Sequence, residues 1–517
     1  MPVLTLRAAR IPVVALTAGA LLTGCAGMGG GSSGDKTINV LMVNNPQMVD
    51  LQKLTKKYFT KKTGITVRFT MMPENEVRDK ISQDFANQAR QYDVATISNF
   101  EVPFYAKNGW LLPLDGYAAK DKAFDQKDVL PSMRQSLTAE DGKLYAEPFY
   151  GESSFLMYRK DILAEKHLKM PERPTWQQVA DIAAKVDGAR KGMNGICLRG
   201  LPGWGELMAP LTTVVNTFGG TWFTKDWKAR LDSPEFTKAT KFYVDLVRKH
   251  GEAGAAQSGF AECLNNLTQG KSAMWYDATS AAGSLESPKS PVKGKIGYVQ
   301  APVEKTDSSG WLYTWAWGVQ KASRHPDNAW KFISWASSKE YESLVGKTFG
   351  WSNVPAGKRS STYSSAEYRD TAGSFSEETR KAILSAKPRD PGVQPRPTIG
   401  IQFVDIPEFA DLGTKVAQEI SAGRPPVRPS PARHAPDEPG PSTPRQPGAS
   451  PPRAAGAVAC WEQHPSGGRR RRTGRCQQAG PFTGGLPPGA RPGRRHQVAQ
   501  DGWPQPSEFL LMVSPLA

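Results

Sequence analysis

The sequence predicts an α/β protein of two lobes, joined by hinge crossings, with a central cleft between them. Strand-like and helix-like patterns alternate from residue 37 to residue 97, which favours a mainly parallel sheet. A strand, a small polar joint and a second strand follow within 142–163. The 517 residues exceed what one small core requires, so two or more domains are expected. Crossings between lobes commonly line ligand sites.

The N-terminus has the pattern of an export signal. Two arginines precede the apolar run 11–22, which is too short to remain in a bilayer as a spanning helix. Cys25 follows Thr-Gly and resembles the lipobox cysteine of bacterial lipoproteins; the alternative is an ordinary secretory signal with a chance cysteine. We predict a lipoprotein signal over 1–25 and a Gly/Ser tether over 26–35. The protein would then lie outside the cytoplasm, held to the outer face of the cell membrane by a lipid at Cys25.

The first lobe is predicted from three strands with helices between them. The strands are expected at 37–43, 65–71 and 92–97, with a helix over 48–60 and another from residue 74. Ligands of open α/β sheets bind beyond the carboxyl ends of the strands. The polar side chains expected at these ends are those of Asn44, Asn45, Glu74, Asn75, Asn99 and Glu101. Alternatively, any one of the asparagines is a turn former or a helix cap.

The crossing into the second lobe is expected within 142–163. A first strand, GKLYAEPF, is closed by Pro148, and the joint Gly151–Ser154 leads to a second strand, FLMYR. Beyond it we predict strands at 194–199 and 400–404, and a helix end that runs into a strand over 269–278. Residues 297–302 and 311–319 are expected to bring the chain back across, and helices are expected at 176–186, 236–249, 329–337 and 339–345. Thr175 is a plausible cap for the first of these helices.

These segments carry a family resemblance. The crossing follows the pattern G-K-x-Y-x-x-P, a gap, then Y-x-K-D-x-L, and it resembles the extracellular solute-binding proteins of ABC sugar importers. The order of segments extends the resemblance over 36–423. The resemblance implies a two-lobed fold of the type II periplasmic-binding-protein kind. It places 36–148 and 300–337 in lobe I, and 149–299 and 338–423 in lobe II.

Within that family the chain most resembles the branch that carries linear polyols such as mannitol, sorbitol and arabitol. The matching blocks include Val43-Asn-Asn45, Phe100-Glu-Val-Pro103, Gly195-Ile-Cys-Leu-Arg-Gly200, Met274-Trp-Tyr-Asp-Ala-Thr279 and Gly350-Trp-Ser-Asn-Val-Pro355. Each block alone is weak, but their common order is specific. The resemblance implies a binding protein that hands a polyol or sugar to permease subunits.

A polyol presents many hydroxyls and little apolar surface, so its site needs fixed donors and acceptors and a few aromatic faces. The predicted ligand-binding residues are Asn45, Glu74, Asn75, Asn99, Glu101, Glu152, Arg199, Trp204, Asp277, Trp315, Trp317 and Trp351. For the tryptophans the alternative is a place in a lobe core. For Arg199 and Asp277 it is an ion pair inside lobe II.

Other classes of function have little support. The net charge of +17 is concentrated in the tail, where residues 424–517 hold 13 arginines and 5 acidic residues, and no basic aromatic stripe favours nucleic acid. Gly270-Lys-Ser272 and Gly346-Lys-Thr348 lack the first glycine of a phosphate-binding loop. His167, His250 and His325 lack metal-ligand spacing. We therefore expect no cofactor, no metal and no enzymatic activity, although paired carboxylates of a glycoside hydrolase cannot be recognised by spacing alone.

Cys197 and Cys263 are the cysteines between the lipobox and the tail, and outside the cytoplasm they either form a disulfide or remain two buried thiols. The tail, 424–517, has 19 of the 42 prolines and no lysine, which is typical of disorder. Its composition also fits out-of-frame translation of a GC-rich gene, so we hypothesise a frameshift near Ala422.

The sequence thus predicts a monomeric, lipid-anchored protein that captures a linear polyol or sugar and delivers it to an ABC permease. Two alternatives remain. One is an oligosaccharide carrier of the same importer class, favoured by a long cleft with stacked tryptophans. The other is an extracellular enzyme that processes carbohydrates.

Overall fold

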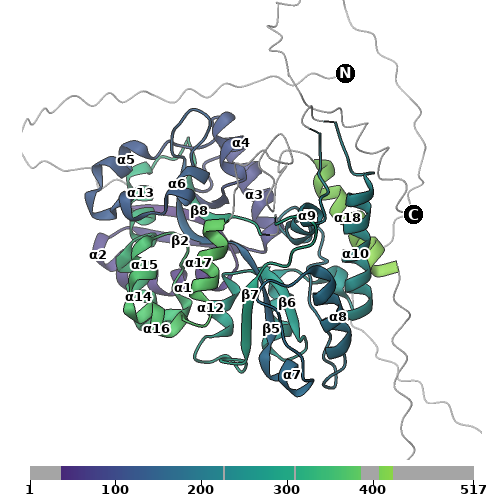
Figure 1. Ribbon diagram of the computed structural model, residues 1–517. Coiled ribbons are helices and arrows are strands. Elements are labelled where there is room, and N and C mark those ends of the chain that lie inside the picture. Colours follow the sequence, from purple (N-terminus) through teal and green to yellow (C-terminus); the bar gives the residue numbers. More distant parts are fainter. Residues whose placement is uncertain (1–35, 225–227, 308–309, 386–406, 423–517) are drawn as a thin grey trace, which may run out of the picture. The chain divides into compact units, whose positions relative to one another are not determined.

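The computed structural model (Figure 1) describes residues 36–385, apart from 225–227 and 308–309, and residues 407–422. All of them belong to one compact unit. The predicted signal with its lipid site at Cys25, the tether, the last predicted strand and the tail lie outside the described residues. Across the described part of the chain, no helix combines the length and the apolar character that crossing a membrane requires.

The larger sheet is mixed, so the expectation of a mainly parallel sheet is corrected here. Its strand order is β2-β1-β3-β8-β4. Strand β1 pairs in parallel with β2 and β3, whereas β8 runs antiparallel to both β3 and β4. The antiparallel pairs arise because β8 is reached from the smaller sheet and not through a helix that returns it in the same direction. The strands are β1 (Thr37–Val43), β2 (Thr66–Met72), β3 (Val94–Ser98), β4 (Ala146–Glu152) and β8 (Tyr313–Val319).

The smaller sheet is antiparallel, with the order β6-β5-β7 (Figure 1). Its strands are β5 (Ser154–Arg159), β6 (Met274–Ala278) and β7 (Ile296–Gln300). The segment 194–199, predicted as a strand, is irregular instead. Asn194 and Cys197 form only single bridges, to Ser272 and Trp275, because 198–206 turns away toward the larger sheet's elements.

The crossing between the sheets is shorter than predicted. Pro148 does not close β4: the strand shifts its register between Pro148 and Tyr150 and continues to Glu152. A β-bulge tolerates proline because the disrupted ladder needs no donor there. Ser153 alone then separates β4 from β5. At Gly151 a Cβ would come 2.5 Å from the carbonyl oxygen of Gly357, so the close approach of the two segments requires glycine.

The helices begin and end at residues with clear local causes. Asn45 caps the first helix through its side chain, and Thr175 forms a capping box with Gln178. Gly64, in the left-handed conformation, ends the predicted helix 48–60, whose last part includes a π-helical turn.

The α-helices are α1 (Pro46–Thr55), α2 (Lys61–Thr63), α3 (Glu74–Ala86), α4 (Glu101–Lys107), α5 (Asp115–Lys120), α6 (Pro131–Ser136), α7 (Lys160–Glu165), α8 (Trp176–Val186), α9 (Met208–Thr217), α10 (Pro234–His250), α11 (Phe260–Thr268), α12 (Ala281–Leu285), α13 (Pro326–Ala336), α14 (Lys339–Phe349), α15 (Ser360–Ser364), α16 (Ala366–Ala372), α17 (Ser376–Ser385) and α18 (Pro407–Ala422). The short π and 3-10 turns are η1 (Lys56–Thr60), η2 (Lys122–Phe124), η3 (Gln126–Asp128), η4 (Ala255–Gln257) and η5 (Trp351–Asn353).

The helices of the C-terminal half return to both sheets. Helix α13 packs on β1 and β8, and α14 packs on α13. Helix α17 contacts β5 and β7, and α18 lies along α10 (Figure 1). In α18, Phe409 lies edge-on to Trp222 with ring centroids 5.0 Å apart. The lobe boundaries remain a prediction: α17 contacts the smaller sheet as that prediction requires, whereas residues 149–152 belong to β4 of the larger sheet and α14 packs on α13.

Candidate functional site

The ends of β1 and β3 are tied to the crossing strands by asparagine side chains. Asn45 accepts from the backbone N–H of Met48 and donates from Nδ2 to the hydroxyl of Tyr150, 2.8 Å away. Asn99 accepts from the N–H of Thr314 and donates to the carbonyl of Leu312. An amide side chain can do both because it carries an acceptor and two donors. These two residues therefore hold the crossings in place, and Asn45 also has the cap role considered for it.

Arg78 is the centre of a buried cluster on α3. The buried face of this helix contains Val77, Ile81 and Phe85. Arg78 is buried with them and lies one turn after Glu74. Its guanidinium donates to Glu74 Oε1 at 2.6 Å and to Glu101 Oε2 at 3.0 Å. A further N–H donates to the hydroxyl of Tyr313, on β8, at 2.6 Å.

These partners keep Arg78 charged although it is 4% exposed. Burial works against the charge, but Tyr313, Glu74 and Glu101 outweigh it and raise the pKa of Arg78 well above its usual value. Glu101 is itself held by the backbone N–H of Ser98, so the cluster is anchored to the end of β3.

Two tryptophan rings lie against the Arg78 guanidinium. Its central carbon lies 3.8 Å from the ring centroid of Trp204 and 4.7 Å from that of Trp315. Trp315 belongs to β8, but Trp204 belongs to the loop that follows 194–199, on the side of the smaller sheet. Cation–π contacts of this kind gain strength when the cation is desolvated. Arg78 therefore joins elements of the two sheets.

The loop around Trp204 fits closely against the start of α3. Asn75 Nδ2 donates to the carbonyl of Pro202 at 2.9 Å. A Cβ on Gly203 would lie 2.4 Å from Asn75 Oδ1, and one on Gly205 would lie 2.1 Å from Glu74 Oε1. Neither glycine leaves room for a side chain, so the approach depends on both.

Arg199 is the centre of a second buried cluster. It donates to both carboxylate oxygens of Asp277, at 2.8 and 2.5 Å, and to the carbonyl of Gly205 at 2.7 Å. Asp277 also accepts from the indole N–H of Trp275 at 2.9 Å. The hydroxyl of Tyr243 donates to the Arg199 carbonyl. Here the ion pair weighed as an alternative for Arg199 and Asp277 is present.

Glu206 lies between the two clusters. Burial raises the pKa of its carboxyl to about 8; Arg199 opposes the shift, while Glu74 and Asp277 add to it. Glu206 also accepts from the backbone N–H of Phe260, at the beginning of α11. The influence of Glu74 on this group places the Arg78 and Arg199 clusters within electrostatic reach of each other.

Glu152 ends β4 at the crossing and is also buried. Burial raises the pKa of its carboxyl to about 8, against the lowering effects of Ser280 and Arg199. The hydroxyl of Ser280 donates to Glu152 Oε2. A cavity of about 30 Å³ adjoins this pair, lined by residues that include Gln47, Tyr150 and Ser280. It has room for one or two waters, so a larger ligand requires the surrounding elements to separate.

The remaining predicted tryptophans lie apart from these clusters. Trp317 is fully buried and packs against Phe149, with ring centroids 5.1 Å apart, so it offers no exposed face in this arrangement. Trp351 is half-buried and packs over Gly346, where a Cβ would lie 2.5 Å from its ring.

Comparisons with known proteins identify the family. The chain matches the family of bacterial extracellular solute-binding proteins over residues 45–343, more than half its length. The chain belongs to this family. It is 40% identical over 394 residues to the mannitol-binding protein of Pseudomonas aeruginosa, covering 76% of this chain and 89% of that protein. It is 25% identical to the erythritol/L-threitol-binding protein of Mycolicibacterium smegmatis, over 59% of this chain and 67% of that one.

Solved structures agree with this family. An ABC transporter solute-binding protein from Agrobacterium vitis, with bound D-mannitol, superposes with a TM-score of 0.70 at 44% identity and covers 75% of this chain and 92% of its own. The maltose-bound MalE3 of T. maritima has a TM-score of 0.64 at 21% identity, covering 75% and 95%, and shows a shared fold. The prediction of a two-lobed periplasmic-binding-protein-like fold is confirmed.

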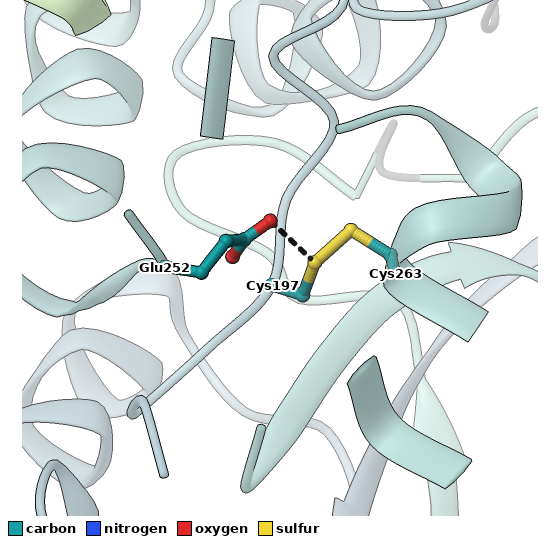
Figure 2. Close-up of side chains that lie close together, drawn as sticks. All are labelled: Cys197, Glu252 and Cys263. Carbon is teal, nitrogen blue, oxygen red and sulfur yellow. Dashed lines mark hydrogen bonds between the residues drawn. A yellow bond between two sulfur atoms is a disulfide. The ribbon is translucent and has the colours of Figure 1, made fainter. Parts of the chain in front are cut away.

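The solute-binding protein carries a disulfide at Cys197, two residues before Arg199. Cys197 and Cys263 are bonded, with their Cα atoms 5.6 Å apart, and Glu252 Oε1 lies 3.2 Å from the sulfur of Cys197 (Figure 2). Within the described residues, this is where cysteine and carboxylate atoms come close enough to hold a metal ion. Metals bind thiolates, and these sulfurs are bonded to each other, so we interpret the group as a structural brace.

Sequence reasoning missed Arg78, Glu206, Gln47, Tyr150 and Ser280. Of these, Arg78 had a usable signal, since Glu74 and Arg78 are four residues apart in a predicted helix. Its burial and its stacking on Trp204 depend on how the two sheets meet, which no local pattern contains.

Proposed function

We propose that this solute-binding protein captures a linear polyol of the mannitol kind and delivers it to the permease of an ABC transporter without chemical change. The single observation that carries the proposal is the 40% identity to a mannitol-binding protein over three quarters of the chain. The mannitol-bound structure from Agrobacterium vitis supports it. A polyol is recognised through its hydroxyls, and buried carboxylates and arginines supply the charge-assisted bonds for them.

Within this proposal the ligand-binding residues are drawn from those predicted from the sequence, without Trp317, which offers no exposed face, and without the Arg199–Asp277 ion pair, whose partners satisfy each other. The members nearest to the meeting of the two sheets are Glu74, Asn75, Glu152 and Trp204. Glu74 is only partly buried, at 15% exposure of its side chain, and both of its bonds from Arg78 go to Oε1. Its second oxygen can therefore accept from a ligand hydroxyl.

The test is a melting scan of the purified protein with D-mannitol, D-sorbitol, D-arabitol, monosaccharides and disaccharides. A ligand at 100 times its Kd adds about 2.7 kcal/mol, which corresponds to a shift of several degrees. We expect the shift with the linear polyols. A shift only with cyclic sugars would contradict the polyol proposal and keep the family. If mass spectrometry showed that the protein converts any of these ligands, the proposal of delivery without chemical change would be wrong.

We also propose that the protein is a monomer held at the outer face of the cell membrane by a lipid on Cys25. The family description as extracellular supports the location, and the signal-like residues 1–25 support the anchor. Cys25→Ser removes the thiol that would carry the lipid, so cells fed a labelled fatty acid should label the wild-type protein and not C25S. Equal labelling of the two would contradict the anchor.

A further inference from the structure

Arg78 occupies surface that a ring-shaped sugar would need. Pyranose rings bind to proteins by placing their C–H faces on aromatic rings, and tryptophan offers the largest such face. Of the four tryptophans predicted to contact ligand, Trp204 and Trp315 stack on the guanidinium of Arg78. Trp317 is fully buried in the core, and the ring of Trp351 packs over Gly346.

The guanidinium is held firmly in that position. Four of its N–H groups are engaged, two by Glu74, one by Glu101 and one by Tyr313. A planar group fixed by hydrogen bonds in its own plane leaves its faces for aromatic rings. A ring sugar that displaced it would leave Glu101, which is 2% exposed, without its arginine.

We propose that Arg78 determines specificity: by covering the faces of Trp204 and Trp315 it denies a pyranose ring its stacking surface and favours a linear polyol. The inference rests on the proposed function and deepens it. A linear polyol loses little by this, since its chain has no flat face to stack. It gains an anchored carboxylate, because Arg78 fixes Glu74 while leaving one oxygen of Glu74 to accept from hydroxyls.

The experiment compares D-mannitol with methyl α-D-mannopyranoside, a ring form of the corresponding aldose, by isothermal titration calorimetry. The wild-type protein should prefer mannitol by at least about 100-fold. Arg78→Lys keeps a cation for Glu74 and Glu101 but removes the flat group, and it should reduce that preference at least tenfold. If the wild-type protein bound neither ligand and no other polyol, the proposed function itself would be rejected.

Arg159→Lys is the matched control. Arg159 is a buried arginine at the end of β5 that pairs with Asp161 at 2.5 Å. R159K should leave the preference for mannitol unchanged. A preference unchanged within twofold in folded R78K would overturn the inference, as would a wild-type protein that binds the pyranoside as tightly as mannitol.

A second variant covers the case in which R78K does not fold. Trp204→Leu removes one covering ring at a half-buried position and leaves every hydrogen bond of Arg78 in place. It should weaken mannitol binding at least fivefold, because the guanidinium loses its support, without creating affinity for the pyranoside. Unchanged mannitol affinity in W204L would overturn the inference.

Discussion

Arg78 and Arg199 are both buried arginines with carboxylate partners, but their neighbours come from different parts of the fold. Arg199 and the residues it contacts, Asp277 and Gly205 among them, all belong to the segments around the smaller sheet. Arg78 is bonded to its own side by Glu74 and Glu101 and is then covered by Trp204 from the other.

We call Arg199 a scaffold residue, because its partners all belong to one side, and Arg78 a joint residue, because its partners come from both sides. A guanidinium satisfied by its own lobe stabilises that lobe whether or not the two sheets approach each other. A guanidinium with hydrogen bonds on one side and a stacked ring from the other is complete only when they meet. In a solute-binding protein with two lobes, the second arrangement would make closure and recognition of the proposed ligand depend on one residue.

The largest expected effect is the loss of Asp277. In Asp277→Ala, Arg199 stays buried without its bidentate partner, and unfolding in guanidinium chloride should require about 3–5 kcal/mol less. Glu101→Gln in the Arg78 cluster leaves Glu74 and Tyr313 as partners and should cost less, about 1–3 kcal/mol. If E101Q cost as much as D277A, the contrast between scaffold and joint would be wrong.

The disulfide should sharpen the same contrast, because Cys197 lies two residues before Arg199. The bond links residues 66 apart in sequence, and its removal in Cys197→Ser/Cys263→Ser should lower the free energy of unfolding by about 2–4 kcal/mol. The affinity for mannitol should change less than twofold, since the Arg78 side is untouched. Wild-type protein under reducing conditions serves as the comparison, and a large loss of affinity there would contradict the scaffold role.

Much of the fold is predictable from local patterns. Strand β1 spans the residues expected for it, and helix α8 begins after its expected cap, Thr175. Periodicity and caps act over a few residues, so the sequence contains them directly. Pro148 is the instructive exception: proline predicts the end of a strand, but a shift of register in the pairing with β8 absorbs it.

The candidate site was less accessible to prediction. Residue types gave Glu74, Glu101, Trp204 and Trp315 as ligand contacts, and the structure gathers all four around Arg78, which the sequence had not singled out. The grouping depends on contacts between residues more than 100 positions apart. Which carboxylate faces a ligand and which holds a neighbour is decided by packing, not by spacing.

A smaller effect is expected where the loop of Trp204 meets α3. In Gly205→Ala the new methyl would lie 2.1 Å from Glu74 Oε1 and 3.0 Å from Arg78 Nε, so Glu74 must leave its place beside Arg78. Mannitol affinity should fall about tenfold, or about 1.4 kcal/mol, as measured by calorimetry.

Gly116→Ala is the control for this methyl group. It lies in α5, where a Cβ would meet nothing within 4 Å, and it should leave the affinity unchanged. Equal affinities for G205A and the wild type would mean that the close approach of loop and helix is not needed for binding.

The smallest effect is a dependence on pH to which Glu206 and Glu147 contribute alongside Glu152. Burial raises the pKa of these carboxyls to about 8 in the folded protein, above the usual value of 4.5. The folded state therefore binds more protons than the unfolded state between about pH 4.5 and 8, and stability falls as pH rises through this window. Melting temperatures should be lower at pH 8.5 than at pH 6, and both Glu206→Gln and Glu147→Gln should reduce the difference.

Only E206Q should also flatten the dependence of mannitol affinity on pH. The carboxyl of Glu206 interacts with Glu74 and Arg199, whereas Glu147 is hydrogen-bonded by Gln126, near the larger sheet. An equal effect of the two variants on affinity would show that the charge between the two arginine clusters has no special part in closure.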